Sequence, residues 1–578
     1  MSDGRTLLLG IPLFAGVPAD HVEALADRAG WRFLDAGEWL FHQGDPADEL
    51  FIVAHGSIEL LTETPETVLH GIYARGEALG ELSLLTGQPR SASARARRDT
   101  QLMCIGREDF ERLLETQSGF ATALVRVLGE RLDRSRPREL PQPPLKALSL
   151  IPLHDGVPID EFADQLVKQL RQFGPVVRLD RLDRDFSFME ASNQWVLLIA
   201  RSHDPDDSWT RYCIRQADRV IGVATRGIRG APKREGKTRG CDLAFGVPRG
   251  VTPDLEGWMD SLEPRAVHIL PHGSPESVAR MARRLAGRAM GVVLSGGGAR
   301  GIAHIGVVEE LERSGFVIDR IGGVSIGAAV GVLFAEGRSA DEVARAIEAA
   351  YVEDTPLRGR TVPIVALSRG EKGLAKQFEI HGNRTIEGLD IPFFCVTSDL
   401  AGQCMVVHRR GPVAIAVSAS QALPAFVPPL KDGDRLLVDG AIFNNLPVAP
   451  MVATGEGPVI AVDVSGRLPV PRAPRSRLPW LRRWLVGPAA DWAPNINETV
   501  LRSILLGSVA ADAAARELAD VVIQPRLRGV ATMRFRDVEA IRSLGREAVR
   551  QALASGAFDA LMAEPEATVR SRERTPTA

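Results

Sequence analysis

The stretch VVLSGGGARG, residues 292–301, places four glycines within six residues directly after a short apolar run. Apolar residues then recur on one face over 302–311, and Gly315 is suited to end that helix. The pattern predicts a buried strand, a tight glycine turn and a helix. Backbone amides in such a turn can hold an anion, either a nucleotide phosphate or an oxygen that becomes negative during a reaction.

The spacing of the glycines is compatible with a nucleotide phosphate. Gly296-x-Gly298-x-x-Gly301 fits the dinucleotide-binding fingerprint, and Asp319 lies about where a ribose-binding acid is expected. Glycines are also expected in any tight turn from a strand to a helix. The fingerprint alone therefore leaves both anions open.

A second glycine-rich motif favours the reaction oxygen. The run RIGGVSIGAAVGVLFAEG contains Gly323-x-Ser325-x-Gly327 between a strand-like and a helix-like segment. This is the nucleophile-elbow pattern, in which glycines permit a strained turn that exposes the serine. Ser325 would stand at a helix N-terminus, where the backbone field favours negative charge.

A third motif, RLLVDGAIFNNLPV, places Asp439 at the end of an apolar run and before Gly440. Such an aspartate is often only a turn former. Because no histidine suggests itself, Asp439 could instead orient Ser325 and accept its proton. An aspartate with a pKa of ~4 is a poor base. Burial would have to raise that pKa, or proton transfer would have to be concerted with attack.

Taken together, GGGARG, GVSIG and DGA, with ASQALPAFVPPL at 419–430 before the last, resemble the patatin-like phospholipase family over residues 289–467. The resemblance implies that Ser325 is the nucleophile, that Asp439 is its partner and that catalysis requires no metal or other cofactor. It also assigns an oxyanion hole to Gly296, Gly297 and Gly298, with Arg300 supporting the loop. His304 is expected to be a packing residue and not a third catalytic group.

Composition limits the remaining classes. The 578 residues exceed what one hydrophobic core supports, so several domains are expected. A formal net charge of −3 gives no reason to expect nucleic acid as a partner. Five scattered cysteines without CxxC spacing argue against a disulfide framework or a zinc site. No window is apolar enough to span a membrane.

The middle of the chain, residues 146–288, alternates strand-like runs with amphipathic helices after a Pro-rich linker at 133–145. This alternation predicts a Rossmann-like parallel α/β spacer domain, to which we assign a scaffold role. Its GAPKREGKT segment, 230–238, is similar to a P-loop but has five residues between its glycines where the motif has four. A solvated basic loop is the simpler interpretation, with contact to anionic lipid headgroups as a minor hypothesis.

The N-terminal region, residues 1–132, is strand-rich and then helical. Its stretch GEALGELSLLTGQPRSASARA, with FHQGDPADELFIVAHGSIEL before it, resembles the phosphate-binding cassette and β-roll of cyclic nucleotide-binding domains. The candidate ligand residues are Gly80, Glu81, Leu82, Arg90 and Ser91, with cAMP or cGMP as the regulatory ligand, cAMP slightly favoured. Free amides at the helix start and the planar Arg90 guanidinium suit a phosphate. The alternative is a retained fold that no longer binds nucleotide.

The C-terminal region, 468–562, is expected to be a helical extension of the catalytic domain, followed by a disordered tail at 563–578. The segment PRAPRSRLPWLRRWLVGPAADW, 471–492, mixes arginine with tryptophan and leucine. Such a segment suits an element lying on lipid or a cover over the active-site mouth.

The order of the regions resembles neuropathy-target-esterase-like proteins. The predicted fold is multidomain α/β: an N-terminal β-roll, a Rossmann-like spacer and a patatin-like hydrolase domain. We expect a serine esterase acting on lysophospholipids or phospholipids, cytoplasmic and peripheral at the membrane surface. One alternative is a cyclic-nucleotide sensor whose hydrolase fold is inert. The other is a nucleotide-dependent enzyme that uses the glycine loop as a phosphate site.

Overall fold

The structure is a computed structural model of the 578-residue chain. It describes residues 4–62, 68–134, 145–181, 186–228, 238–272, 274–353, 366–465, 499, 506–530, 532 and 535–562. The chain divides into two compact units, residues 1–286 and 287–578. Among the described helices, none has the length and apolar character needed to cross a bilayer.

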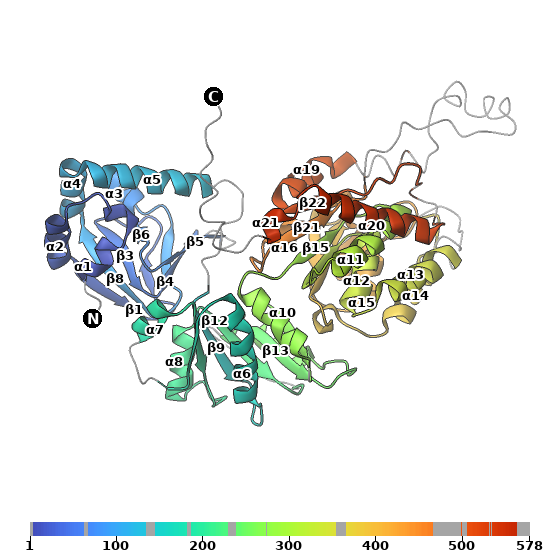
Figure 1. Cartoon of the computed structure of the whole chain (residues 1–578), viewed down its shortest axis with the longest axis horizontal. Coiled ribbons are helices and arrows are strands. Elements are labelled where there is room, and N and C mark those ends of the chain that lie inside the picture. Colours follow the sequence, from blue (N-terminus) through green and yellow to red (C-terminus); the bar gives the residue numbers. More distant parts are fainter. Residues whose placement is uncertain are drawn as a thin grey trace, which may run out of the picture. The chain divides into compact units, whose positions relative to one another are not determined.

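The first unit begins with two four-stranded antiparallel sheets, in the orders β1-β8-β3-β6 and β2-β7-β4-β5, which together form the predicted β-roll (Figure 1). Short apolar runs make the strands, and glycines with positive φ such as Gly37, Gly44 and Gly56 make the turns between them. The strands are β1 (Gly30–Leu34), β2 (Trp39–Phe41), β3 (Glu49–His55), β4 (Ser57–Thr62), β5 (Val68–Ala74), β6 (Ala78–Leu79), β7 (Ser93–Ala96) and β8 (Thr100–Gly106).

Helices flank this roll on both sides in the sequence. Two of them, α4 and α5, come from the run that the sequence analysis expects to be helical, and Phe110 and Phe120 from these helices meet edge to face in the core. The helices are α1 (Gly4–Leu9), the 3₁₀ turn η1 (Pro12–Phe14), α2 (Ala19–Arg28), α3 (Glu81–Thr86), α4 (Arg107–Thr116) and α5 (Ser118–Arg134).

The second part of this unit is a six-stranded parallel sheet in the order β10-β11-β9-β12-β13-β14. Its central strands β9 and β11 are buried along their whole length, as expected for a parallel sheet with helices on both faces. The strands are β9 (Ala147–Pro152), β10 (Val176–Leu179), β11 (Trp195–Ile199), β12 (Arg219–Ala224), β13 (Asp242–Val247) and β14 (Val267–Pro271). The helices are α6 (Ile159–Leu170), the 3₁₀ turn η2 (Arg171–Phe173), α7 (Phe186–Ser192), α8 (Ser208–Gln216), α9 (Glu256–Leu262) and α10 (Pro275–Leu285).

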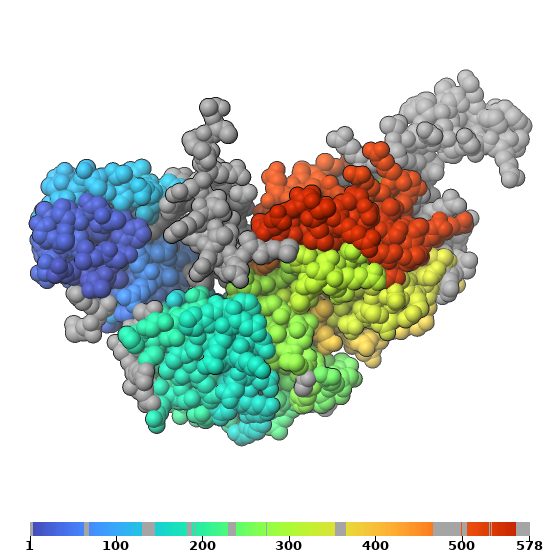
Figure 2. Space-filling view, in the orientation of Figure 1, coloured from blue at the N-terminus to red at the C-terminus, as the bar shows by residue number. Residues whose placement is uncertain are grey.

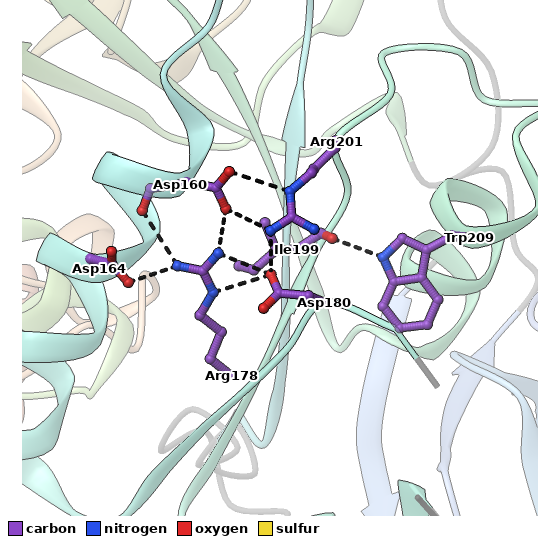
Figure 3. A network of polar contacts seen from close by, with 7 residues as sticks. All are labelled: Asp160, Asp164, Arg178, Asp180, Ile199, Arg201 and Trp209. Atoms are coloured by element: carbon purple, nitrogen blue, oxygen red, sulfur yellow. Dashed lines mark hydrogen bonds and ion pairs between the residues drawn. The ribbon is translucent and has the colours of Figure 1, made fainter. Parts of the chain in front are cut away.

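A network of charges joins the carboxyl ends of two strands to a helix start in this sheet (Figure 3). Arg178 contacts Asp160, Asp164 and Asp180, and Arg201 donates to Asp160 at 2.9 Å and to Asp180 at 3.1 Å. Every member of the network thus has an oppositely charged partner. Because these side chains are partly exposed, we assign the network a modest structural role and no chemistry.

Buried ion pairs connect the β-roll to the parallel sheet within the first unit. Arg98, between β7 and β8, is buried and pairs with Asp218 at 3.0 Å and with Glu190. Arg215 of α8 reaches back to Asp99 at 3.0 Å. Removing a partner of Arg98 would leave an uncompensated buried charge, whereas the Arg215–Asp99 pair is partly exposed and contributes less.

The second unit is built on an eight-stranded mixed sheet in the order β19-β20-β17-β16-β15-β21-β22, with β18 paired to β17. The strands β17, β16, β15, β21 and β22 run parallel, and β18, β19 and β20 are antiparallel additions. The strands are β15 (Gly291–Leu294), β16 (Arg320–Gly323), β17 (Phe393–Asp399), β18 (Cys404–His408), β19 (Leu430–Asp432), β20 (Arg435–Asp439), β21 (Val459–Val462) and β22 (Val521–Ile523).

Helices enclose this sheet, and the most buried of them is α12, whose every residue is inaccessible to solvent or nearly so. An apolar circumference of this kind is typical of a helix inside a core. The helical elements are η4 (Gly298–Ile302), α11 (Ala303–Arg313), α12 (Ile326–Ala335), α13 (Ala340–Glu348), η5 (Ala349–Glu353), α14 (Glu371–His381), η6 (Ile386–Gly388), α15 (Val413–Ser420), η7 (Gly440–Ile442), α16 (Ala449–Val452), α19 (Val509–Leu518), α20 (Val538–Ala554) and α21 (Asp559–Met562).

The C-terminal helix α20 packs closely on α11, the helix that follows the glycine loop. Gly306 of α11 and Gly545 of α20 face backbone atoms of the opposite helix, where an added Cβ would overlap a carbonyl oxygen. Arg542 and Arg546 then pair with Glu309 at 2.7 and 3.0 Å. Figure 2 shows the C-terminal segments, in red, forming one surface with the yellow-green residues of α11.

The C-terminal extension is predicted to be helical, but its described residues include one strand. Residues 521–523 form the strand β22, which pairs in parallel with β21 and continues the sheet. Three consecutive residues, Val-Val-Ile, are too few to show a strand period, which is why the sequence does not separate them from the flanking helices. The lipid-contacting segment 471–492, the P-loop-like residues 230–237 and the tail at 563–578 lie outside the described residues.

Candidate active site

The glycine loop follows β15 at the carboxyl end of the parallel strands. Ser295, the first residue after the strand, is fully buried, and its Oγ accepts a hydrogen bond from the Val464 amide at 2.9 Å. The Gly296 amide donates to the carbonyl oxygen of Asn445 at 3.2 Å. The loop therefore starts from a position fixed by two neighbouring chain segments.

The amides of the glycine loop fall into two groups, those with a hydrogen-bond acceptor and those without one. The Ala299 amide donates to the carbonyl of Thr532 at 2.8 Å, and the Arg300 amide donates to Gly297 at 3.3 Å. For the amides of Gly297 and Gly298, no acceptor is found among the residues that the structure describes. Gly298 has φ +56°, and an added Cβ there would overlap the Thr532 carbonyl. Only glycine fits this position.

The Arg300 side chain is directed at backbone carbonyls. Its Nε donates to Val530 at 3.1 Å, and one terminal nitrogen, Nη1, donates to Ser465 at 2.6 Å. Burial lowers the pKa of this guanidinium from its ordinary value. Arg300 thus ties the glycine loop to the backbone at Val530 and Ser465.

Ser325 occupies a strained turn between β16 and α12. Its backbone has φ +54° and ψ −125°, a conformation that residues other than glycine rarely adopt. The neighbouring glycines make room for it: an added Cβ on Gly323 would lie 2.6 Å from the backbone of Gly327. The Ser325 amide donates to the Oγ of Ser420 at 3.0 Å, which holds the turn from the opposite side.

The carboxylate of Asp439 meets the Ser325 hydroxyl although 114 residues separate them. Ser325 Oγ donates to Asp439 Oδ2 at 2.7 Å, and Asp439 Oδ1 accepts from the Ala441 amide at 2.9 Å. Asp439 is 2% exposed, and burial raises its pKa to about 6 against the opposing effect of these two hydrogen bonds. The carboxylate is therefore a stronger base than an ordinary aspartate and is charged at neutral pH.

Two residues that our sequence analysis does not single out complete this arrangement. Asn445 exchanges hydrogen bonds with Gly296: its carbonyl accepts the Gly296 amide, and its Nδ2 donates to the Gly296 carbonyl at 3.4 Å. Ser420 supports Ser325 as described above. Both lie in stretches already notable in the sequence, FNNLPV after Asp439 and ASQALPAFVPPL before it. The feature of the sequence that could identify both residues is their position next to these motifs.

Two other residues weighed in the sequence analysis, His304 and Asp319, take no part in this arrangement. His304 is fully buried with its Nε2 2.8 Å from the Ser295 carbonyl, and burial lowers its pKa to about 4, so it is neutral at pH 7. Asp319 precedes β16 and accepts a hydrogen bond from the Met290 amide at the amino ends of the strands. The glycine loop lies at the carboxyl ends, so Asp319 is at the wrong edge of the sheet for a ribose on that loop.

The cassette residues of the β-roll also lie together. The buried Arg90 donates to the carbonyls of Gly80 at 3.2 Å and Glu49 at 2.8 Å, with its guanidinium 4.4 Å from the Phe41 ring centroid. Glu81 is buried at the start of α3. Leu82 and Ser91 are exposed beside them. Gly80, Glu81 and Leu82 thus lie at the start of α3, and Arg90 contacts the first of them.

Two family models match the chain, one in each of its two units. The family model described as cyclic nucleotide-binding domain matches residues 31–117, and the one described as patatin-like phospholipase matches residues 292–388. Lysophospholipase nte1 of Neosartorya fischeri is 28% identical over 75% of this chain, and neuropathy target esterase sws of Drosophila melanogaster is 27% identical over 76%. The alignments cover only 35% and 36% of those two relatives.

A bacterial relative matches over almost the full length of both proteins. An NTE family protein of Mycobacterium tuberculosis is 34% identical to this chain, and the alignment covers 96% of this chain and 97% of the relative. The match therefore spans the β-roll, the parallel α/β sheet and the mixed sheet with its glycine loop in one alignment. This chain belongs to the NTE family.

Proposed function

We propose that the second unit is a serine esterase that hydrolyses the fatty-acyl ester of lysophospholipids and phospholipids, with Ser325 as nucleophile and Asp439 as base. The observation that carries the proposal is the 2.7 Å hydrogen bond from the strained Ser325 hydroxyl to a buried carboxylate of raised pKa. The patatin-like match over 292–388 and the fungal relatives named lysophospholipase support a lipid substrate.

The reaction follows from this geometry in two steps. As Ser325 Oγ bonds to the ester carbonyl carbon, its proton passes to Asp439 and the carbonyl oxygen becomes negative. The Gly297 and Gly298 amides are the loop donors left for that oxygen. The tetrahedral intermediate then expels the glycerol oxygen, which takes the proton from Asp439 and leaves an acyl-enzyme. Water activated by the same carboxylate releases the fatty acid. A preorganised amide donor of this kind contributes about 100- to 1000-fold in rate.

The direct test is covalent labelling of the folded chain with a fluorophosphonate, a reagent for activated serines. We expect one label per chain, on the peptide that contains Ser325, with loss of ester hydrolysis in parallel. Fatty-acid release from 1-palmitoyl-lysophosphatidylcholine provides the activity readout. A folded chain that neither labels nor releases fatty acid would favour the alternative of a sensor with an inert hydrolase fold.

The bonding of Asn445 yields a further prediction. Asn445→Ala removes the side-chain bond to the Gly296 carbonyl but keeps the backbone bond, so Gly296 loses one of its two hydrogen bonds to Asn445. We expect kcat to fall about 10- to 100-fold with little change in KM, because the loop acts on the transition state. The rate of fluorophosphonate labelling should fall with kcat.

The neighbouring Asn444 offers a matched control. Its side chain accepts only the local Leu446 amide at 3.1 Å, so Asn444→Ala should change kcat less than threefold, a change of well under 1 kcal/mol. Equal losses in both variants would show that general destabilisation, and not the restraint on Gly296, is responsible.

We also propose that the β-roll binds a cyclic nucleotide, with cAMP first, which regulates the esterase. The family-model match over 31–117 and the convergence of Gly80, Glu81 and Arg90 on α3 support this proposal. The phosphate would take the place of the carbonyls that Arg90 now contacts, and the α3 amides would complete its shell.

Thermal unfolding tests the nucleotide site. Saturating cAMP, at about 100 times its Kd, should stabilise the β-roll by about 3 kcal/mol and raise its melting temperature. The shift should vanish in Arg90→Ala and persist in Arg126→Ala, which removes an exposed arginine of the same domain. A shift of the same size in Arg90→Ala would rule out this cassette as the binding site.

A further inference from the structure

A cavity of about 610 Å³ opens in the second unit between α14, the end of α15 and residues 427–430. Its volume is within the range of small-molecule binding sites. One wall is apolar, with Leu374, Val427 and Pro428. Its polar lining includes Tyr351, Arg369, Lys372, Ser418 and Gln421.

This cavity adjoins the catalytic pair through three consecutive residues. Ser420 accepts the Ser325 amide at 3.0 Å, and the Ala422 carbonyl accepts the Asp439 amide at 3.0 Å. Gln421, between them, lines the cavity. Because neighbouring Cα atoms are 3.8 Å apart, the wall of the cavity begins about one residue from the groups that hold Ser325 and Asp439.

The inner end of the cavity offers polar groups whose bonding is incomplete. The buried Tyr351 hydroxyl donates to Gln421 Oε1 at 2.5 Å, which fixes the orientation of that amide. The Gln421 Nε2 and the Ser418 Oγ are buried, and neither finds a hydrogen-bond partner within the described part of the chain. A buried donor without an acceptor costs about 1–3 kcal/mol, so a ligand with acceptor oxygens is favoured here.

The outer rim of the cavity carries charges of both signs, the carboxylates Glu371 and Glu379 as well as cations. Arg369 and Lys372 are exposed, and across the described ranges neither forms an ion pair. Lys376, deeper on the same helix, pairs with Glu379 at 3.0 Å. An arginine fork and a lysine ammonium together suit a phosphate. Outward from Ser325, the cavity thus presents first the unsatisfied polar groups of Gln421 and Ser418 and then the cations.

We propose that this cavity binds the phosphoglycerol head group of the lipid whose acyl ester Ser325 attacks. The free glycerol hydroxyl lies against Gln421 and Ser418, and the phosphate lies between Arg369 and Lys372 at the rim. The inference rests on the proposed esterase function and adds to it that the enzyme discriminates in favour of a phosphate at the glycerol end.

Two substrates that differ only in the phosphate test the assignment: 1-palmitoylglycerol and 1-palmitoylglycerol 3-phosphate. The readout is the ratio of kcat/KM for the phosphorylated ester to that for the neutral ester, measured by fatty-acid release. In the double variant Arg369→Gln with Lys372→Gln we expect this ratio to fall about tenfold or more, the effect of losing a charge-assisted contact. A double variant of exposed arginines elsewhere in the unit, Arg313→Gln with Arg345→Gln, should keep the wild-type ratio.

A second variant tests the inner end without removing volume. Gln421→Glu keeps the acceptor for Tyr351 but replaces the unsatisfied donor by a carboxylate oxygen that repels phosphate. We expect the same ratio to fall at least fivefold, and a melting temperature near that of the wild type would show that the fold is kept. An unchanged ratio in both variants would overturn the head-group assignment, as would a change in acyl-chain preference alone.

Soluble phosphates separate a lipid site from a site for free anions. Glycerol 3-phosphate should inhibit hydrolysis of 1-palmitoylglycerol more strongly than equimolar inorganic phosphate, because only the former also contacts Gln421 and Ser418. Equal inhibition by the two would overturn the head-group assignment. The esterase proposal is tested separately: it fails only if the wild-type chain releases no fatty acid from either ester.

Discussion

Ser325→Ala should reduce ester hydrolysis and fluorophosphonate labelling to the background of the uncatalysed reaction. Removing the nucleophile of a serine hydrolase typically costs about 10⁴- to 10⁶-fold in kcat. The expected loss is this large because Asp439 and the glycine-loop amides then have no covalent step to assist. Fatty-acid release measured at micromolar enzyme, with labelling measured on the same preparation, gives the comparison.

Two companion variants separate catalysis from folding. Ser398, on β17 of the same sheet, is fully buried, and its hydroxyl finds no hydrogen-bond partner among the described residues, so Ser398→Ala should retain activity. Ser325→Gly should be as inactive as Ser325→Ala but more stable by about 1–3 kcal/mol, because glycine adopts φ +54° without strain. If Ser325→Ala kept more than a few per cent of the activity, another nucleophile would have to be responsible.

The parts of the site that the sequence predicts are those that a short stretch determines by itself. A strand, a glycine turn and a helix over 292–311 are a local pattern, and the structure has β15, η4 and α11 there. The elbow at Ser325 is equally local, since Gly323 and Gly327 are needed within four residues for the turn to form. Asp439 is predicted from the order of the three motifs, because no local feature of the sequence indicates that it contacts Ser325.

The bonds that the sequence does not predict are those between distant segments. Asn445 with Gly296, Ser420 with Ser325, and Thr532 with Ala299 each join residues between 95 and 233 positions apart. The Thr532 bond is accepted by a main-chain carbonyl, which any residue supplies, and asparagine and serine side chains form such bonds in many environments, so residue identity carries little information about the partner. The loop amides are the clearest case, because the Gly296 amide donates to Asn445, whereas those of Gly297 and Gly298 have no acceptor among the described residues.

The proposed mechanism places two opposite electrostatic requirements on one site. The base must be buried to have a raised pKa, and the developing oxyanion must face donors that burial has kept unpaired. Asp439 keeps only two donors, Ser325 and Ala441, so burial dominates its pKa. The glycine loop is held through Asn445, Thr532 and Arg300, and none of these contacts uses the amides of Gly297 and Gly298. For the base and for the amide donors alike, backbone segments approach each other closely at glycine residues.

Asp439→Asn should lower kcat about 10⁴-fold while preserving the local geometry. The asparagine carbonyl can still accept the Ala441 amide, and its amide can donate to Ser325 Oγ, but it cannot take the serine proton. In a serine triad, the corresponding loss of an aspartate costs about this factor although that residue only orients a histidine. Wild-type kcat/KM should rise with pH and level off above about 6, the pKa of Asp439, and the residual activity of the variant should lack this step.

The same substitution should make the protein more stable at neutral pH, and the sign follows from the raised pKa. A carboxyl with a folded pKa of about 6 and an ordinary value of 3.8 holds its proton more tightly in the folded state, so its contribution to stability is lost as pH rises between these values. Above pH 6 the buried charge costs about 3 kcal/mol, which asparagine avoids. Urea unfolding of both proteins at pH 8 and at pH 4 should show a large advantage for the variant at pH 8 that disappears at pH 4. A variant less stable than the wild type at pH 8 would mean that Asp439 is stabilised by charges other than those of the described contacts, and its role as a base of raised pKa would be wrong.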